Sequence, residues 1–262
     1  MSATALHALD GAHLYMAAGD VMVDGSGIRD LSVPTFLIEH EQGLVLIDTG
    51  LAPESFGGPE YGREAVYGDL RDFAIARCER GKSVIDQLAT VGKRPEDVTH
   101  VVLTHDHFDH TGGLPHFPQA ILHIGRADWE NVQGVMNGTR VDPVVRPGDF
   151  APVLDSTWRL LEGDVDLFGD ASMRLIAEPG HTMGNYAVLL RLPSRTVLLT
   201  GDTAHLRAQY DSETPMPLDA DRTLAAQAMR NVKDLAAAED ADVWIGNDFG
   251  DWLRFRGPTT LK

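Results

Sequence analysis

The stretch Thr104-His105-Asp106-His107-Phe108-Asp109-His110-Thr111-Gly112-Gly113 places three histidines and two aspartates in the six positions 105 to 110. It follows the apolar run Val101-Val102-Leu103, which is typical of a buried strand. The two glycines at its end interrupt regular structure. We therefore expect the cluster on a loop at the end of a strand, where a rigid sheet can hold a site.

The side chains of this cluster are those that bind transition metals. Imidazole nitrogens and carboxylate oxygens suit zinc, iron, manganese or cobalt, and the candidates here are His105, His107, Asp109 and His110. The alternative is a polar surface loop that happens to be rich in histidine. So many ligand groups directly after a buried strand favour a metal site.

The cluster matches the signature His-x-His-x-Asp-His of the metallo-β-lactamase superfamily, which the chain resembles along nearly its whole length. Leu46-Ile47-Asp48-Thr49-Gly50 is similar to the early strand and turn of that family. Glu178-Pro179-Gly180-His181-Thr182-Met183-Gly184 resembles the loop of its third histidine. Leu199-Thr200-Gly201-Asp202 resembles the strand of its bridging aspartate.

Within this superfamily the sequence is most similar to the N-acyl-homoserine lactonases. The likeness rests on His13-Leu14-Tyr15, on Val33-Pro34 and on Leu160-Leu161-Glu162-Gly163-Asp164. The resemblance implies an α/β fold, the αβ/βα four-layer sandwich of the metallo-β-lactamase type, with residues 1–262 as a single hydrolase domain.

The resemblance also implies a ligand set of two metals. His105, His107 and His181 would bind one ion, Asp109 and His110 the second, and Asp202 would bridge them. Two such ions can hold a hydroxide that attacks a carbonyl, and Asp109 would pass a proton to the leaving oxygen. Zinc is the expected metal, as one or two ions, with iron, manganese or cobalt as alternatives.

Asp48 has two interpretations. It is either a turn-forming residue before Thr49-Gly50 or, by the resemblance, an aspartate that supports the metal loop from behind the ligands.

One position departs from the lactonase pattern. Those enzymes carry a last histidine ligand in a Gly-His-Asp stretch, where this chain has Gly246-Asn247-Asp248. An amide oxygen is a poor ligand for a transition metal, so a second site that includes Asn247 would be weaker. His205 stands where the best-known lactonases have a tyrosine that contacts the substrate carbonyl. It is a candidate for polarising that carbonyl or reaching the metal, and an exposed histidine without a role is the alternative.

Composition narrows the classes of partner. The chain has 39 acidic and 22 basic residues, a formal charge of −17, which opposes binding to nucleic acid or anionic membrane. A small neutral lactone or ester is easier to reconcile with it. The chain begins without a basic region followed by an apolar run, and Cys78 is the single cysteine. We expect a cytoplasmic protein, with a homodimer as a further candidate.

Apolar periodicity predicts the remaining elements. Helices are expected at 83–91, with Ser83 as N-cap, at 127–133 and at 221–239. Residues 50–68 form a long loop that is a candidate lid or dimer arm. Residues 134–152 form either a second pocket-lining loop or a plain connector. Strands are expected at 12–18, 33–39, 44–48, 98–104, 119–124, 158–161, 173–177, 186–192, 195–200 and 243–245.

The function that these features favour is a metal-dependent hydrolase that opens a lactone. One alternative is another ester or thioester hydrolase of the glyoxalase II type. A second is a catalytically weakened ligand-binding protein, suggested by Asn247. A non-haem iron oxidase is a more distant alternative, because the chain is too short to hold a flavin domain as well. The six other histidines lack a ligand context and are interpreted as surface or packing residues: His7, His13, His40, His100, His116 and His123.

Overall fold

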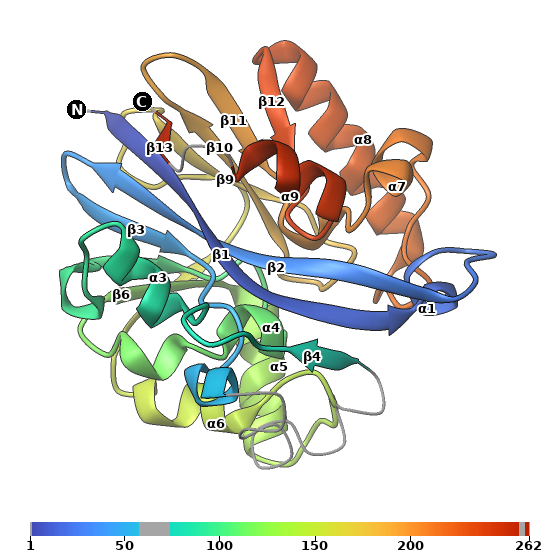
Figure 1. The fold of residues 1–262 in the computed structure, drawn as a ribbon, viewed down its shortest axis with the longest axis horizontal. Helices are drawn as coiled ribbons and strands as arrows, with labels where there is room; N and C mark the ends of the chain where they lie inside the picture. Colours follow the sequence, from blue (N-terminus) through green and yellow to red (C-terminus); the bar gives the residue numbers. More distant parts are fainter. Residues whose placement is uncertain (1, 58–73, 257–259, 262) are drawn as a thin grey trace.

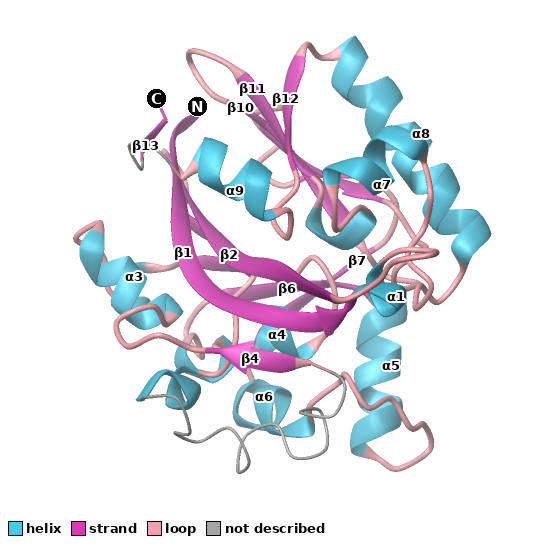
Figure 2. Ribbon diagram, turned by 45° about the vertical axis from the view of Figure 1, so that its right-hand side comes forward, coloured by secondary structure: helices cyan, strands magenta, loops and turns pink. Residues whose placement is uncertain are grey.

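Two β-sheets packed face to face, with helices on their outer sides, form the architecture of this protein (Figures 1 and 2). The computed structural model describes residues 2–57, 74–256 and 260–261. The predicted loop 50–68 therefore lies mostly outside the described residues. Among those that are described, no helix combines the length and the apolar character needed to cross a bilayer.

The first sheet is built mainly from the N-terminal half of the chain. Its strands are β1 (Ala3–Ala17), β2 (Ile28–His40), β3 (Gly43–Ile47), β4 (Ile75–Arg77), β5 (His100–Val102), β6 (Ile121–Gly125), β7 (Thr157–Leu161) and β13 (Thr260–Leu261). They lie in the order β13-β1-β2-β3-β5-β6-β7, and β4 pairs with β1. The strands β3, β5, β6 and β7 run parallel to one another, so their carboxyl ends meet at one edge of the sandwich.

The second sheet comes from the C-terminal half. Its strands are β8 (Val165–Asp166), β9 (Met173–Ala177), β10 (Tyr186–Arg191), β11 (Thr196–Leu199) and β12 (Ala241–Trp244), in the order β12-β11-β10-β9-β8. The described helices are α1 (Ala18–Val21), α3 (Val84–Thr90), α4 (Phe108–Thr111), α5 (Arg126–Met136), α6 (Pro147–Phe150), α7 (Arg207–Ser212), α8 (Arg222–Ala238) and α9 (Phe249–Phe255).

Alternating side chains of the strands supply separate apolar layers, because successive residues of a strand point to opposite faces. On β3, Val45 and Ile47 belong to the core between the two sheets, together with Val188 of β10. Leu46, between them, packs instead in the layer that holds Leu88 of α3 and Val132 of α5. One short strand therefore serves two layers.

The second sheet is covered in the same way by α8. Leu189 and Leu198 of that sheet pack with Met229 and Val232 of the helix, and Asp221 caps the helix by accepting from the backbone N–H groups of residues 223 and 224. The layer order is helix, sheet, sheet, helix. The predicted four-layer αβ/βα sandwich is confirmed.

Most predicted elements are confirmed, with shifts of a few residues at their ends. Ser83 caps α3 as predicted, because its side chain accepts from the backbone N–H of Asp86. The strand predicted at 12–18 is wrong at both ends, since β1 begins at Ala3 and α1 begins at Ala18. Six of the seven residues from Ala3 to Leu9 are buried, so this part of β1 lacks the apolar–polar alternation that marks a half-exposed strand.

The region 134–152 is not wholly a loop. It contains α6 and the start of a 3-10 helix, Ala151–Val153, and each of the two has a proline at its first or second position. The short strands β4 and β8 and the helices α4, α7 and α9 were also not predicted. Each spans seven residues or fewer, which is too short for periodicity to mark it.

We predict that Gly112→Ala destabilises the fold by about 1–3 kcal/mol, the usual range for forcing atoms into a packed interior. A Cβ at Gly112 would lie 2.2 Å from the backbone nitrogen of Ala52 and 2.5 Å from the carbonyl carbon of Leu51. Gly148→Ala is the matched control, because a Cβ there meets no atom within 4 Å. The unfolding free energy in denaturant, measured on metal-free protein, tests this, and equal values for the two variants would contradict it.

Candidate metal centre

The predicted ligands lie on loops that leave one edge of the sandwich. The loop after β5 and the following helix α4 carry His105, His107, Asp109 and His110. The loop between β9 and β10 carries His181. Two further segments, after β11 and after β12, carry Asp202, His205 and Asn247. Both sheets therefore contribute to the cluster, which explains why its members are so far apart in the sequence.

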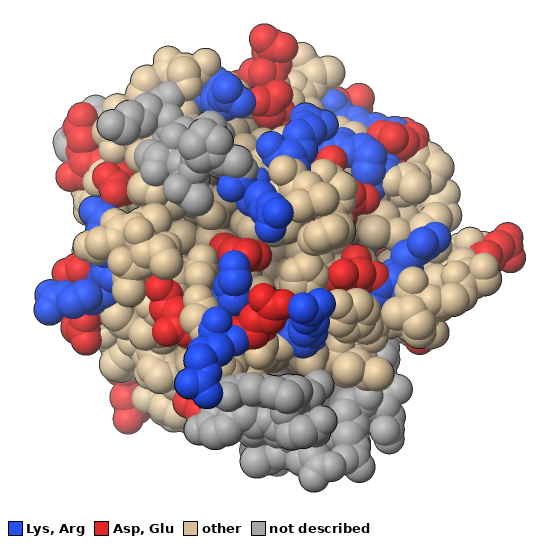
Figure 3. Space-filling model, viewed as in Figure 1, with Lys and Arg blue, Asp and Glu red and all other residues tan. Residues whose placement is uncertain are grey.

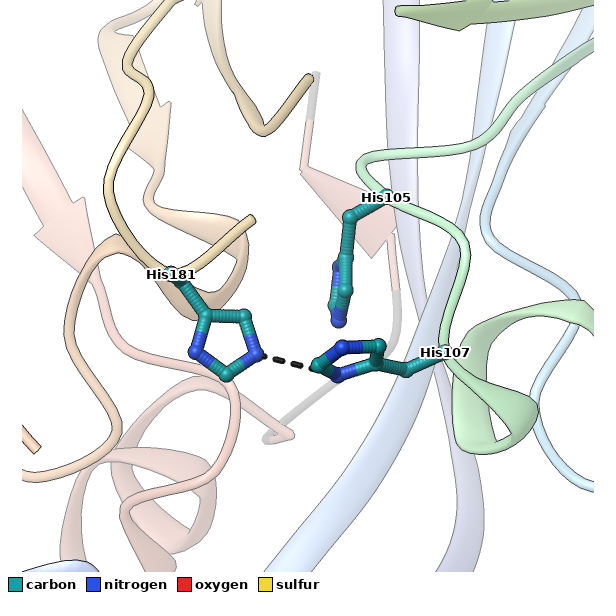
Figure 4. Close-up of side chains that lie close together, drawn as sticks. All are labelled: His105, His107 and His181. Carbon is teal, nitrogen blue, oxygen red and sulfur yellow. Dashed lines mark hydrogen bonds between the residues drawn. The ribbon is translucent and has the colours of Figure 1, made fainter. Parts of the chain in front are cut away.

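Three imidazoles converge on one point (Figure 4). The nearest nitrogens of His105, His107 and His181 all lie within 4.8 Å of one another, and His181 Nε2 is 3.1 Å from His107 Nδ1. Nitrogens bound to one zinc ion at 2.0–2.1 Å are about 3.3 Å apart. The spacing fits one shared metal ion.

Asp202 lies between this group and His110. Its Oδ2 is 3.8 Å from His105 Nε2 and 3.6 Å from His181 Nε2, while its Oδ1 is 3.5 Å from His110 Nε2. His110 Nε2 is also 3.5 Å from Asp109 Oδ2. The structure thus brings together six of the predicted site residues, five of them around the buried carboxylate of the sixth, Asp202.

Unsatisfied polar atoms at this point support a cation. His105 Nε2, His110 Nε2 and Asp202 Oδ1 are buried, and none of them makes a hydrogen bond within the described part of the chain. A buried polar atom without a partner costs free energy comparable to a lost hydrogen bond. Imidazole nitrogens and carboxylate oxygens that face one another without hydrogen bonds are the donor set that zinc or a related ion satisfies.

The ligands are held from behind by further hydrogen bonds. Asp48 Oδ1 accepts from the backbone N–H of Thr104, and its Oδ2 accepts from Thr104 Oγ1 and from His110 Nδ1 at 2.8 Å. On the other side, Asp219 Oδ1 lies 2.9 Å from His181 Nδ1. These contacts fix the ring orientations and leave the Nε2 atoms of His110 and His181 for a metal.

Asp219 was not predicted from the sequence, although it makes the same kind of contact as Asp48. It stands 38 residues after His181, in a segment without regular structure. Only the three-dimensional fold brings the two together. Asp48, by contrast, could be found because it ends an apolar strand next to a Thr-Gly turn.

Electrostatics within the cluster divide the imidazoles into two kinds. Burial, reinforced by neighbouring imidazoles, lowers the pKa of His105 and of His107 well below the usual value. Burial also opposes the charged form of His110, but Asp202, Asp109 and Asp48 outweigh it and raise the pKa of that ring. Neutral imidazoles are the form that binds a metal, so His105 and His107 are ready as ligands near neutral pH.

The cluster opens into a cavity of about 420 Å³, a size typical of small-molecule sites. Asp109, His181, Asp202, His205 and Asn247 all line it. The predicted pocket-lining role of 134–152 applies to four of its residues, Arg140, Asp142, Pro143 and Val144, which lie in the wall. The apolar side chains of the wall are Leu14, Met16, Leu31, Phe108, Val144, Met183, Met216 and Leu218.

A polar side of the same cavity was not predicted. Asn131 Nδ2 donates to Asp106 Oδ2 at 3.0 Å and to Asp142 Oδ2 at 2.9 Å, and Asp128 lies beside them in the wall. Asp106 stands within the motif but is not among the ligand candidates predicted from the sequence. Its partners come from α5 and from the following loop, so no local pattern could have marked them.

The histidines outside the cluster have other surroundings. His13 Nδ1 lies 2.7 Å from Asp30 Oδ1, and His40 Nε2 lies 3.0 Å from Asp170 Oδ2. His100 Nδ1 faces His123 Nε2 at 3.0 Å. None of them lies in a group of potential metal ligands within the described residues, which fits their interpretation as packing or surface residues.

We predict that Asp48→Asn lowers zinc affinity by about 10- to 100-fold, the effect usual for losing a partner behind a ligand. One oxygen of Asp48 would become an amide that cannot accept from Thr104 or His110. Asp30→Asn is the matched control, because that carboxylate pairs with His13 away from the centre. Calorimetric titration of each metal-free protein with zinc measures the effect, and equal affinities for the two variants would refute it.

Comparison with proteins of known sequence gives relatives that match over most of the chain. An N-acyl homoserine lactonase AttM of Rhizobium johnstonii is 29% identical over 241 residues, covering 90% of this chain and 89% of the relative. An N-acyl homoserine lactonase from a Bacillus species is 27% identical over 246 residues, covering 89% and 92%.

Solved structures agree in fold. An N-acyl homoserine lactone hydrolase, with the product N-hexanoyl-L-homoserine bound at its catalytic metal center, superposes with a TM-score of 0.85 at 20% identity over the whole of both chains. AidC, a dizinc quorum-quenching lactonase, superposes with a TM-score of 0.69 at 14% identity, covering 99% of this chain and 91% of AidC. The family model of the metallo-beta-lactamase superfamily matches residues 28–245, and this chain belongs to that superfamily.

Proposed function

We propose that this protein is a metal-dependent hydrolase that opens the lactone ring of an N-acyl-homoserine lactone or a close analogue. The observation that carries the proposal is the cluster of imidazoles and carboxylates at the floor of a cavity with an apolar wall. The relatives named as N-acyl homoserine lactonases support the same substrate class.

The metals would be held by the ligands named from the sequence. His105, His107, His181 and Asp202 would hold the first ion, and Asp109, His110 and Asp202 the second. Bound there, such ions supply a nucleophile at neutral pH and polarise the carbonyl that it attacks. The dizinc lactonase among the structural relatives supports zinc, and the donor set also suits iron, manganese or cobalt.

The side chains of this protein would orient the lactone and transfer a proton to its ring oxygen during ring opening. Asp109 is buried and lines the cavity, a position from which its carboxylate could take a proton from the attacking water and pass it to the ring oxygen as the ester bond breaks. Leu14, Met16 and Phe108 lie in the same wall. They would bind an acyl chain, since removing apolar surface from water stabilises the complex.

Charge supports a small neutral substrate. The formal charge is −17, and on the face in Figure 3 the basic side chains are interspersed with acidic ones. Nucleic acids and anionic membranes need a continuous basic surface. We propose that neither is a partner. We further propose that the protein acts in the cytoplasm, with a homodimer as its candidate assembly.

We predict that His105→Ala or His181→Ala lowers lactone hydrolysis by at least 1000-fold, because each removes a direct ligand of the ion that polarises the carbonyl. His116→Ala and His123→Ala are the controls. They remove histidines outside the potential ligand groups and should keep the rate within a few-fold. Initial rates of hydrolysis and the amount of bound metal, measured for each variant, test this prediction. Full activity in metal-free protein would overturn the proposed function.

We predict that a panel of esters separates the lactonase from its alternatives. N-acyl-homoserine lactones should be opened with release of acid. Titration with base at constant pH measures that release. Turnover of S-lactoylglutathione without any lactone turnover would assign a thioesterase of the glyoxalase II type instead. Binding of lactones without turnover of any ester would assign a ligand-binding protein.

A further inference from the structure

His205 occupies a position among the imidazoles that neither of the two proposed ligand sets includes. It is buried, and its Nε2 lies 3.0 Å from Asp202 Oδ2. Its ring also meets the ring of His181 edge-on, with centroids 4.8 Å apart. The predicted alternative of an exposed histidine is therefore wrong, because the segment after β11 folds back into the cavity.

The two oxygens of Asp202 distinguish the two sides of the centre. Oδ2 is the oxygen nearest to His205, at 3.0 Å, and it is the one that also faces His181 and His105. Oδ1 faces His110 at 3.5 Å. His205 thus shares its carboxylate oxygen with the first proposed ligand set and not with the second.

A small second cavity lies beside Asp202 and His110. It has a volume of about 20 Å³, enough for one water-sized species, and is lined by His110, Asp202 and Asn247 but not by His181 or His205. Asn247 lines this small cavity as well as the large one, so it reaches the side of His110 without being confined to it. Its side chain is buried, and its amide oxygen is the atom that could contact an ion there.

We propose that His205 Nε2 is a ligand of the first metal, which then has four imidazoles and the Asp202 carboxylate. The remaining side has one imidazole, from His110, with the oxygens of Asp109, Asp202 and Asn247. The first site is rich in nitrogen and suits zinc, while the second is rich in oxygen and suits a harder ion such as manganese. The proposal concerns metal binding, so it does not depend on which ester the protein hydrolyses.

The distances around His205 suit a shared ion, and His181, Asp202 and His205 form a group of potential metal ligands. Ligand atoms around one zinc ion stand about 3.3 Å apart when the bonds are 2.0–2.1 Å long. The separations of Asp202 Oδ2 from His205 Nε2 and from His181 Nε2, 3.0 and 3.6 Å, lie on either side of that value. One ion can therefore contact all three atoms after small side-chain movements.

The first test counts ligands in the unaltered protein. X-ray absorption at the zinc edge, with one equivalent of zinc per metal-free chain, should require four imidazoles. A fit that needs only three would overturn the proposal. Because no variant is involved, the outcome cannot be attributed to misfolding.

The second test separates a ligand from a hydrogen-bond partner. His205→Gln keeps an N–H donor for Asp202 but removes the imidazole nitrogen, so the affinity for the first zinc should fall at least tenfold in calorimetric titration. His123→Gln is the matched control and should leave that affinity unchanged, since His123 lies in no group of potential metal ligands among the described residues. Wild-type affinity in His205→Gln would overturn the proposal.

A third measurement addresses the second side. Asn247→His should allow a second zinc to bind at least tenfold more tightly while the first remains as in the wild type. Tightening of the first zinc instead would place Asn247 on the side of His205 and contradict the division. Lactone turnover enters none of these readouts, so failure of the proposed lactonase activity would leave them intact.

Discussion

The buried carboxylate of Asp202 is the group on which the rest of the centre depends. A carboxylate removed from water is costly unless cations or hydrogen-bond donors surround it. Burial alone would raise the pKa of Asp202, but His110 and His205 outweigh that effect and hold it well below its usual value. The buried aspartate thus requires the imidazoles as much as a metal does. A fold that buries Asp202 must also place imidazoles around it.

The sandwich meets this requirement by joining its two halves at one edge. The first sheet supplies the imidazoles of the motif after β5, and the second supplies His181 and Asp202. The loops can approach closely because glycines stand where side chains would collide: a Cβ at Gly112 would meet the backbone of Leu51 and Ala52, and one at Gly180 the backbone of Ala225. The apolar layers between and outside the sheets then hold these loops in place.

How much of the fold and of the metal centre could be predicted from the sequence depends on how far apart in the chain the contacting residues stand. The loop after a buried strand was predictable, because the apolar run and the ligand cluster are adjacent. The later ligands were predictable only through the resemblance to a family. The pairing of His181 with Asp219 and of Asn131 with Asp106 and Asp142 was missed, since such pairs are set by the packing of whole elements. The early start of β1 was missed because burial on both faces erases alternation.

Asn247, which stands where the lactonase pattern has a histidine, has to be considered together with His205. Considered alone, Asn247 suggests a weakened centre, because one nitrogen ligand is missing. In the structure a further imidazole, that of His205, lies 3.0 Å from the Asp202 carboxylate, so the nitrogen that is absent at position 247 has a counterpart elsewhere around this carboxylate. A centre with unequal sides would bind its two ions with unequal strength, and the ion that the oxygen-rich side receives would then depend on which metals the surroundings offer.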